Sequence, residues 1–243
     1  MAKYGLVGKN IGYSFSKNFF TTKFEKEKRH DTYNNFDIEC ITEFTNIISE
    51  NSDLKGLNVT IPFKESIISY LDKIDKEAKA IGAVNTIKIM KNGKLNGYNT
   101  DHYGFAKVLT EIPPLKERTA LILGTGGASK AIKYVLETLG FKIIFVSRNE
   151  QDNFITYKDL NKEIISRHFL IINCTPLGTF PNVDQFPDIP YQFLTKEHFL
   201  FDLTYNPQIT SFMKFGKVQG ANTCNGMKML EYQAKKAWTI WKR

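Results

Sequence analysis

Apolar residues recur along this chain in two alternating patterns, one with the period of a strand and one with the period of a helix. Strand patterns lie at residues 4–7, 32–38, 56–59, 119–123, 142–146, 170–173 and 199–203. Amphipathic helix patterns lie between and after them, at residues 17–28, 41–49, 101–110, 127–139 and 227–238. Strands and helices that alternate through short connections are typical of βαβ units, so we predict an α/β fold with a mostly parallel sheet.

Two features interrupt this succession. Residues 86–90 and 94–98 form strand patterns on either side of Asn92-Gly93, a dipeptide that favours a hairpin turn, so we predict a hairpin there. Pro113 and Pro114, in a charged stretch, end the helix pattern that begins at Asp101. Because the succession of strands and helices then restarts, we predict two α/β domains joined near residue 101.

The excess of basic residues does not alter the predicted fold and adds little about partners. The net charge is +8, but acidic and basic residues alternate in the stretches 23–29 and 73–79, as they do on solvated helix faces. Scattered charge of this kind is unlike a nucleic-acid-binding surface, so we expect no nucleic acid partner. A positive excess does favour anionic small molecules as substrates and cofactors.

The remaining composition is that of a soluble globular protein, with 42% hydrophobic and 24% charged residues. Cys40, Cys174 and Cys224 lack the spacing of zinc ligands or of a disulfide framework, so we expect free thiols and no metal site. No apolar run approaches the roughly 20 residues that span a membrane, and the first residues are unlike a signal peptide. We therefore expect a cytoplasmic protein with no membrane partner.

A glycine-rich turn follows the apolar strand at 119–123 and begins the next helix. Its residues are Gly124, Thr125, Gly126, Gly127, Ala128 and Ser129. In dinucleotide-binding turns the first glycine permits the tight bend, the second lets the backbone approach a pyrophosphate, and the helix N-terminus faces the phosphates. The order of strand, turn, helix and strand is the one this motif requires, so we predict a dinucleotide site.

The end of the following strand predicts which dinucleotide binds. NAD sites usually carry an acidic residue there, which holds the ribose 2′-hydroxyl. This chain has Ser147 and Arg148, and an arginine can form a charge-assisted contact with a 2′-phosphate. We therefore predict NADP as the cofactor. A solvent-facing Arg148 is the alternative, and Glu150 and Asp152 would repel a phosphate if they turned inward.

Polar residues gather at the predicted strand ends of the first hundred residues. They are Ser14, Ser16, Asn58, Thr60, Lys64, Asn85, Thr86, Asn99, Thr100 and Asp101. Ligands of open parallel sheets bind outside the carboxyl ends of the strands, and these hydroxyls, carboxamides, lysine and aspartate suit a small, hydroxyl-rich anion. Each residue also has a structural explanation on its own, such as a helix cap for Asp101 or a turn for Asn85. Their joint placement indicates a substrate site.

Eight ordered segments make the chain resemble the shikimate dehydrogenase family over almost its whole length. They are residues 5–8 with 14–16 (GLVG, SFS), 58–65 (NVTIPFKE), 82–86 (GAVNT), 99–101 (NTD), 124–128 (GTGGA), 173–178 (NCTPLG), 202–207 (DLTYNP) and 233–234 (QA). The resemblance implies a substrate-binding and catalytic domain of residues 1–101, completed by a C-terminal helix at 226–243. It also implies a Rossmann-like NADP-binding domain of residues 102–225.

The reaction implied by this resemblance is the reversible, NADPH-dependent reduction of 3-dehydroshikimate to shikimate. This step belongs to the route to chorismate and the aromatic amino acids. The expected partners are the small-molecule substrate and NADP, in a protein that is a monomer or a homodimer.

The same resemblance implies roles for individual residues. The catalytic pair would be Lys64 and Asp101. Substrate would be bound by Ser14, Ser16, Asn58, Thr60, Asn85, Tyr205 and Gln233. NADP would be bound by Gly124, Gly126, Gly127, Ala128, Ser147, Arg148, Thr175 and Met227. Hydride addition to a carbonyl builds negative charge on oxygen, so a proton donor such as Lys64 is needed there, with Asp101 as the carboxylate that orients it.

The chain departs from the family pattern near the cofactor. Residues 147–149 read Ser-Arg-Asn where the family often has Asn-Arg-Thr, Gln151 and Asp152 occupy the region of a second arginine, and Lys228 replaces a glycine. These departures bear on the choice of NADP over NAD rather than on the reaction. A quinate/shikimate dehydrogenase that uses NAD or NADP is therefore the first alternative. The second is a non-catalytic sensor of shikimate-pathway metabolites, against which the intact catalytic pair argues.

Overall fold

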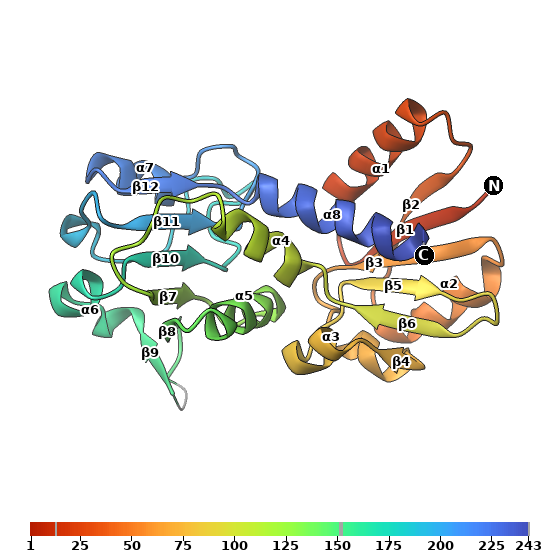
Figure 1. Cartoon of the computed structure of the whole chain (residues 1–243), viewed down its shortest axis with the longest axis horizontal. Helices are drawn as coiled ribbons and strands as arrows, with labels where there is room; N and C mark the ends of the chain where they lie inside the picture. Colours follow the sequence, from red (N-terminus) through yellow and green to blue (C-terminus); the bar gives the residue numbers. More distant parts are fainter. Residues whose placement is uncertain (13, 151–152, 243) are drawn as a thin grey trace. The chain divides into compact units, whose positions relative to one another are not determined.

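The computed structural model describes residues 1–12, 14–150 and 153–242. The chain forms two compact units, which Figure 1 shows in the colours of the sequence. Unit 1 comprises Met1–Gly104 and Leu230–Arg243, and unit 2 comprises Phe105–Met229. Each unit contains its own six-stranded sheet, so the predicted fold class of two α/β sheets is confirmed.

Unit 1 has a mixed sheet with the strand order β2-β1-β3-β5-β6-β4. Its strands are β1 (Lys3–Gly8), β2 (Thr32–Asp37), β3 (Leu54–Val59), β4 (Lys73–Ile74), β5 (Thr86–Ile89) and β6 (Leu95–Tyr98). β1 pairs in parallel with β2 and β3, whereas β5 is antiparallel to both β3 and β6. The predicted hairpin is therefore present as β5 and β6, with Gly93 at a φ of +80° in its turn.

The helices of unit 1 pack on this sheet through aromatic side chains. They are α1 (Phe15–Lys26), the 3₁₀ helix η1 (Ile41–Glu43), α2 (Phe44–Glu50), η2 (Ser66–Tyr70), α3 (Lys76–Ile81), the start of α4 (Asp101–Leu109) and most of α8 (Met227–Lys242). Phe20 and Phe24 of α1 and Trp238 and Trp241 of α8 form one buried cluster with Tyr4 of β1. Residues three or four apart share one face of a helix, so each pair faces the cluster together.

Unit 2 has an all-parallel sheet with the strand order β12-β11-β10-β7-β8-β9. Its strands are β7 (Thr119–Leu123), β8 (Lys142–Ser147), β9 (Phe154–Thr156), β10 (Leu170–Asn173), β11 (Phe199–Asp202) and β12 (Asn222–Cys224). β7, β10 and β11 are buried at every position, as expected for parallel strands covered on both faces. Numbered along the chain, this is the Rossmann order, in which the strand order reverses between β7 and β10.

The helices of unit 2 connect these strands. They are α5 (Gly127–Thr138), η3 (Tyr157–Asp159), α6 (Lys162–Ser166), η4 (Tyr191–Phe193), α7 (Ser211–Val218) and the rest of α4. Open α/β sheets bind ligands at the carboxyl ends of the strands where the order reverses. The loops after β7 and β10 are therefore the part of unit 2 that positions a candidate site.

One connection in unit 2 departs from the usual dinucleotide fold. β8 and β9 pair in parallel, with Phe145 opposite Phe154, although only residues 148–153 connect them. A parallel crossover usually needs a dozen or more residues and contains a helix. No helix lies among the described residues between β8 and β9, and the side chains of Ile143 and Phe145 are only half-buried. The rings of Phe145 and Phe154 pack on each other at a centroid distance of 5.1 Å.

The structure contains several short strands and helices in addition to the elements predicted from the sequence. The pattern did not predict β4, β9, β12, α3, α6 and α7, because segments of two to eight residues are too short to establish a period. The two units divide inside α4 and α8, close to residues 101 and 226, where the sequence placed the domain boundaries. Those boundaries, as limits of two functional domains, stay a prediction.

Gly56 in β3 makes room for the indole of Trp241, which provides a test of how unit 1 is packed. A Cβ at this position would collide with the Trp241 ring, whose Nε1 donates to the backbone oxygen of Ile87 at 2.9 Å. We expect Gly56→Ala to lower the free energy of unfolding by about 1–3 kcal/mol, the usual cost of overpacking. Both tryptophans lie on α8, so urea unfolding followed by tryptophan fluorescence reports on unit 1.

Gly12→Ala is the matched control, because a Cβ there would meet nothing within 4 Å. It should change the unfolding free energy by less than about 0.5 kcal/mol. Equal stability of the two variants would contradict the packing of Trp241 on β3.

Candidate active site

Lys64 and Asp101 form a largely buried ion pair in unit 1. Lys64 Nζ donates to Asp101 Oδ2 at 2.7 Å, and the two side chains are 13% and 9% exposed. Lys64 lies in the turn after β3, and its backbone oxygen accepts a hydrogen bond from the Val84 amide at 2.7 Å, which anchors that turn. Asp101 is the first residue of α4. The fold thus brings together two residues that lie 37 positions apart in the sequence.

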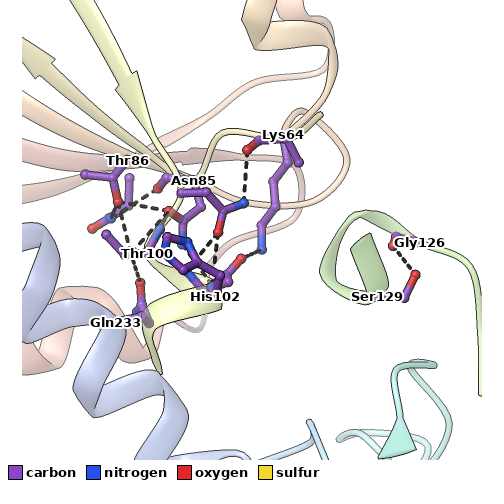
Figure 2. A network of polar contacts seen from close by, with 12 residues as sticks. Lys64, Asn85, Thr86, Thr100, His102, Gly126, Ser129 and Gln233 are labelled. Carbon is purple, nitrogen blue, oxygen red and sulfur yellow. Dashed lines mark hydrogen bonds and ion pairs between the residues drawn. The ribbon is translucent and has the colours of Figure 1, made fainter. Parts of the chain in front are cut away.

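Asn85 holds the second oxygen of Asp101 (Figure 2). Asn85 Nδ2 donates to Asp101 Oδ1 at 2.8 Å, while Asn85 Oδ1 accepts from the Thr100 amide at 2.6 Å. Thr86 Oγ1 also donates to Asn85 Oδ1, at 3.0 Å, and Thr100 Oγ1 donates to Gln233 Oε1 of α8 at 3.2 Å. Asp101 and the four other residues of this network, Asn85, Thr86, Thr100 and Gln233, are all buried. The network therefore connects the catalytic candidates to Asn85 and Gln233, two predicted substrate residues.

His102 follows Asp101 on α4 and is neutral at pH 7. Burial lowers the pKa of its imidazole, and a hydrogen bond to the Asn99 backbone and the charges of Glu77 and Asp101 oppose this only in part. Asn99 Oδ1 accepts from the amides of Asp101 and His102, at 3.0 and 3.3 Å. Asn99 therefore caps the first turn of α4 and fixes the backbone that carries Asp101.

The remaining predicted substrate residues of unit 1 lie on α1 and at the end of β3. Ser14 is the N-cap of α1, with its side-chain oxygen bound to the backbone of the first turn, and Ser16 hydrogen-bonds to the Tyr33 side chain. Thr60 directly follows β3. Asn58, within β3, is 4% exposed, and its Oδ1 accepts a hydrogen bond from the Tyr33 hydroxyl at 2.8 Å.

The glycine-rich turn after β7 in unit 2 has the geometry that a pyrophosphate requires. Gly124 has a φ of +99°, which favours glycine, and a Cβ there would lie 2.9 Å from Thr175 Cγ2. At Gly126 a Cβ would meet nothing within 4 Å, so the backbone is open to an approaching group. α5 begins at Gly127, and the Ser129 hydroxyl donates to the Gly126 oxygen at 2.7 Å (Figure 2). An open turn at a helix N-terminus fits an anionic dinucleotide.

Ser147 and Arg148 lie at the carboxyl end of β8, where dinucleotide folds contact the ribose. Ser147 is buried, and its Oγ accepts from the Asn149 amide at 3.2 Å, whereas Arg148 is exposed. Burial raises the pKa of the nearby Tyr157 to about 12, and the charge of Arg148 opposes this rise. Gln151 and Asp152, which the sequence placed in the region of a second arginine, lie outside the described residues.

Buried hydrogen bonds fix the loops that follow β10 and β11. Asn173 Oδ1 accepts from Thr175 Oγ1 at 2.6 Å, and Asn173 Nδ2 donates to Asp202 Oδ1 at 3.0 Å. Asp202 Oδ2 accepts from Thr210 Oγ1 at 2.6 Å. Asp202 therefore links the loop of Thr175 to the loop that carries the half-buried Tyr205.

Burial also changes the acid–base behaviour of this network. It raises the pKa of the Asp202 carboxyl, and hydrogen bonds from Thr210, Thr204 and Asn173 oppose that rise. It raises the pKa of the Cys174 thiol as well, so this cysteine stays protonated and unreactive. These groups therefore support the loops rather than supply reactive side chains.

Tyr205 and Met227 belong to unit 2, whereas Ser14 and Ser16 belong to unit 1. Met227 is the first residue of α8, and its amide donates to Asn225 Oδ1 at 3.1 Å. Lys228 forms an ion pair with Glu111 at 2.6 Å. The predicted contacts of Tyr205 with substrate and of Met227 with cofactor stay predictions.

Three members of the buried network, Tyr33, Thr86 and Thr100, had no individual role predicted from the sequence, although Thr86 and Thr100 belong to the polar group at the predicted strand ends. Thr86 is adjacent to Asn85 in the sequence, and Thr100 is adjacent to Asp101. This position inside a polar segment was the sequence feature that could have indicated a role for each threonine. Tyr33 gave no such signal, because only the parallel pairing of β2 with β1 and of β1 with β3 reveals its nearness to Asn58.

The Rossmann sheet with its open glycine turn, together with the lysine–aspartate pair of the other unit, defines the chain as a two-unit dinucleotide-dependent dehydrogenase. The model of the shikimate dehydrogenase substrate binding domain matches residues 6–87. The chain is 38% identical over 254 residues to shikimate dehydrogenase (NADP+) of Clostridium perfringens, with 99% of this chain and 92% of the relative covered. The chain belongs to the shikimate dehydrogenase family.

Solved structures of shikimate dehydrogenases support the same family membership. The shikimate dehydrogenase of Aquifex aeolicus superposes with a TM-score of 0.88 at 33% identity, covering 99% of this chain and 92% of that one. The Thermus thermophilus enzyme, solved in complex with NADP(H) and shikimate, superposes with a TM-score of 0.86 at 27% identity, covering 99% and 93%. The family, the reaction class and the cofactor predicted from the sequence are therefore confirmed at the level of the family.

No described helix combines the length and the apolar character needed to cross a membrane. Nor does the described part of the chain bring together three or more histidine, cysteine, aspartate or glutamate side chains as metal ligands.

The network around Asp202 leads to a prediction for unit 2. Thr210 is 1% exposed, donates to Asp202 and caps α7 by accepting from the Met213 amide at 3.3 Å. Thr210→Val keeps the shape but removes both hydrogen bonds, so we expect a loss of about 1–3 kcal/mol in the free energy of unfolding. Urea unfolding followed by far-ultraviolet circular dichroism measures it. The control is Thr138→Val at an exposed site on α5; a loss no larger at Thr210 than at Thr138 would contradict the role of this network.

Proposed function

We propose that this protein catalyses the reversible, NADPH-dependent reduction of 3-dehydroshikimate to shikimate, with Lys64 and Asp101 as its catalytic pair. The observation that carries the proposal is the 2.7 Å contact between Lys64 Nζ and Asp101 Oδ2 in a buried setting. A buried pair of this kind is expensive to maintain, because both charges lose their hydration. Its retention beside Asn85, in a chain of this family, supports a chemical role.

In the proposed reaction, NADPH supplies the hydride to the carbonyl carbon of the substrate. Negative charge then builds on the carbonyl oxygen, and the Lys64 ammonium donates a proton to that oxygen to give the hydroxyl of shikimate. Asp101 orients the ammonium through Oδ2, and Asn85 keeps Asp101 in place through Oδ1. Solvent returns the proton to Lys64 after the product leaves.

The other predicted residues would hold the two ligands. Ser14, Ser16 and Tyr205 would bind the substrate carboxylate, with Asn58, Thr60 and Gln233 near the ring and Asn85 and Asp101 on ring hydroxyls. Gly124, Gly126, Gly127 and Ala128 would line the pyrophosphate, Ser147 and Arg148 the 2′-phosphate end, and Thr175 and Met227 the nicotinamide half. On this proposal unit 1 is the substrate domain and unit 2 the NADP domain, in a cytoplasmic monomer or homodimer.

A second candidate function, oxidation of quinate as well as shikimate with NAD or NADP, is favoured by one observation. The connection of residues 148–153 is too short for the usual crossover helix, whose N-terminal amides would help to hold a 2′-phosphate. Discrimination between the two dinucleotides would then depend on side chains such as Arg148.

The direct experiment is NADPH oxidation with 3-dehydroshikimate, repeated with NADH. The proposal expects turnover with NADPH at a higher kcat/KM than with NADH, and absence of turnover with either would overturn it in favour of a non-catalytic metabolite sensor. Oxidation rates with shikimate and quinate under each cofactor decide between the first and second candidates. Light scattering after gel filtration gives the oligomeric state.

Replacing Lys64 tests the proton donor. We expect Lys64→Ala to lower kcat by about 10²–10⁴-fold, the usual contribution of general acid–base catalysis, while KM for 3-dehydroshikimate stays close to that of the wild type. Steady-state NADPH oxidation measures both constants. Lys79→Ala, on the exposed surface of α3, is the control and should leave both constants unchanged. Retention of more than about a third of the wild-type kcat by Lys64→Ala contradicts the assignment.

Replacing Arg148 tests the 2′-phosphate contact. We expect Arg148→Ala to lower kcat/KM for NADP+ by about 10- to 100-fold, the value of one charge-assisted hydrogen bond, and to leave kcat/KM for NAD+ unchanged. Shikimate oxidation at a fixed, saturating shikimate concentration measures the two values. Arg167→Ala, which removes an exposed ion pair with Glu163 on α6, is the control. A parallel loss with both dinucleotides would contradict a contact with the 2′-phosphate.

A further inference from the structure

Tyr33 stands at the start of a chain of hydrogen bonds that ends on the catalytic pair. Its hydroxyl donates to Asn58 Oδ1 at 2.8 Å, and Asn58 Nδ2 donates in turn to Thr86 Oγ1 at 3.2 Å. Thr86 Oγ1 donates to Asn85 Oδ1 at 3.0 Å, and Asn85 Nδ2 donates to Asp101 Oδ1 at 2.8 Å. Every member of this chain is less than 9% exposed.

The direction of donation is the same at every step. A carboxamide has one acceptor end and one donor end, and the two ends differ little in shape, so their orientation depends on the partners around them. Tyr33 offers a proton to Asn58, which fixes Oδ1 toward Tyr33 and Nδ2 toward Thr86. Because Thr86 accepts from Asn58, its own proton is available to Asn85 Oδ1 at 3.0 Å or to Thr100 Oγ1 at 3.2 Å. Together with the Thr100 amide, which donates to Asn85 Oδ1 at 2.6 Å, it keeps the donor end of Asn85 toward the carboxylate of Asp101.

The surroundings of Tyr33 keep its hydroxyl in this role. The ring is 3% exposed and stacks on Phe20 of α1 at a centroid distance of 4.8 Å and an interplanar angle of 12°. Burial raises the pKa of the phenol, and a hydrogen bond from Ser16 opposes this only in part, so Tyr33 remains a neutral donor. Its proton goes to Asn58 Oδ1 at 2.8 Å.

We propose that Tyr33 is a positioning residue, which orients the carboxamides of Asn58 and Asn85 and thereby holds Asp101 in its reactive position without touching the substrate. The inference rests on the proposed function, because it assigns a purpose to the placement of Asp101. Without the Tyr33 hydroxyl, Asn58 Oδ1 loses its buried donor, and the carboxamide is held only by the bonds of Nδ2 to Thr86 Oγ1 and to the Asn85 backbone oxygen, both at 3.2 Å, so the support of Asn85 and Asp101 is weakened.

The test is shikimate oxidation by Tyr33→Phe, which keeps the stacked ring and removes only the hydroxyl. We expect kcat/KM for shikimate to fall about three- to tenfold, the effect of one neutral hydrogen bond, while KM for NADP+ is unchanged. Tyr4→Phe is the matched control, because Tyr4 is a buried ring of the same aromatic cluster, 5.0 Å from Trp241, and it should retain the wild-type kcat/KM.

A double-mutant cycle distinguishes positioning from a loss of stability. If Tyr33 acts through Thr86, then Tyr33→Phe combined with Thr86→Val lowers kcat/KM no further than Thr86→Val alone. If the tyrosine only supports the fold, the single variant unfolds more readily but its kcat/KM, corrected for the folded fraction, equals that of the wild type. Multiplicative effects of the two changes also contradict the proposal.

Three further cases separate failure of the variant, of the proposed function and of the inference about Tyr33. If Tyr33→Phe does not fold, Thr86→Val replaces it, since this change interrupts the same chain of hydrogen bonds at a later member; an unchanged kcat/KM for shikimate in that variant contradicts the proposal. If the wild-type protein itself fails to oxidise shikimate, the proposed function fails. If the wild type is active and Tyr33→Phe matches it, only the inference about Tyr33 fails.

Discussion

A carboxylate inside a protein must be matched by a cation or by hydrogen-bond donors, because leaving it unpaired costs several kcal/mol. Asp101 meets this requirement twice, with Lys64 on one oxygen and Asn85 on the other. The three residues come from the turn after β3, the position just before β5 and the start of α4, so all these elements must meet at one place. The candidate site is therefore also a constraint on how unit 1 folds.

The two units meet different physical demands. Unit 1 mixes parallel and antiparallel strands and buries polar side chains in a satisfied network, which suits recognition of a hydroxyl-rich ligand. Unit 2 has an all-parallel sheet whose central strand β7 is fully buried, and the backbone at Gly126 is open to an approaching group. This arrangement suits an anionic dinucleotide. Asp202 shows that burial of a carboxylate is not by itself a sign of chemistry. Its hydrogen bonds order two loops instead of activating a reactant.

The sequence predicted the strands, the longer helices and the hairpin because their hydrophobic periods are long enough to recognise. It also predicted Lys64, Asn85 and Asp101 as a group, since all lie at strand ends or helix starts. It could not predict Tyr33, whose role depends on strand pairing between distant segments. Nor could it predict the direct connection from β8 to β9, because the short strand at Phe154–Thr156 has no period of its own.

The central claim is that Lys64 and Asp101 act as one unit at the step in which hydride is transferred. Single-turnover NADPH oxidation at saturating 3-dehydroshikimate, compared among Lys64→Ala, Asp101→Asn and the double variant, tests it most directly. We expect the double variant to react no more slowly than the slower single variant, since either change already disables the pair. Rates that fall multiplicatively in the double variant would show that the two residues act independently and would contradict their action as one unit.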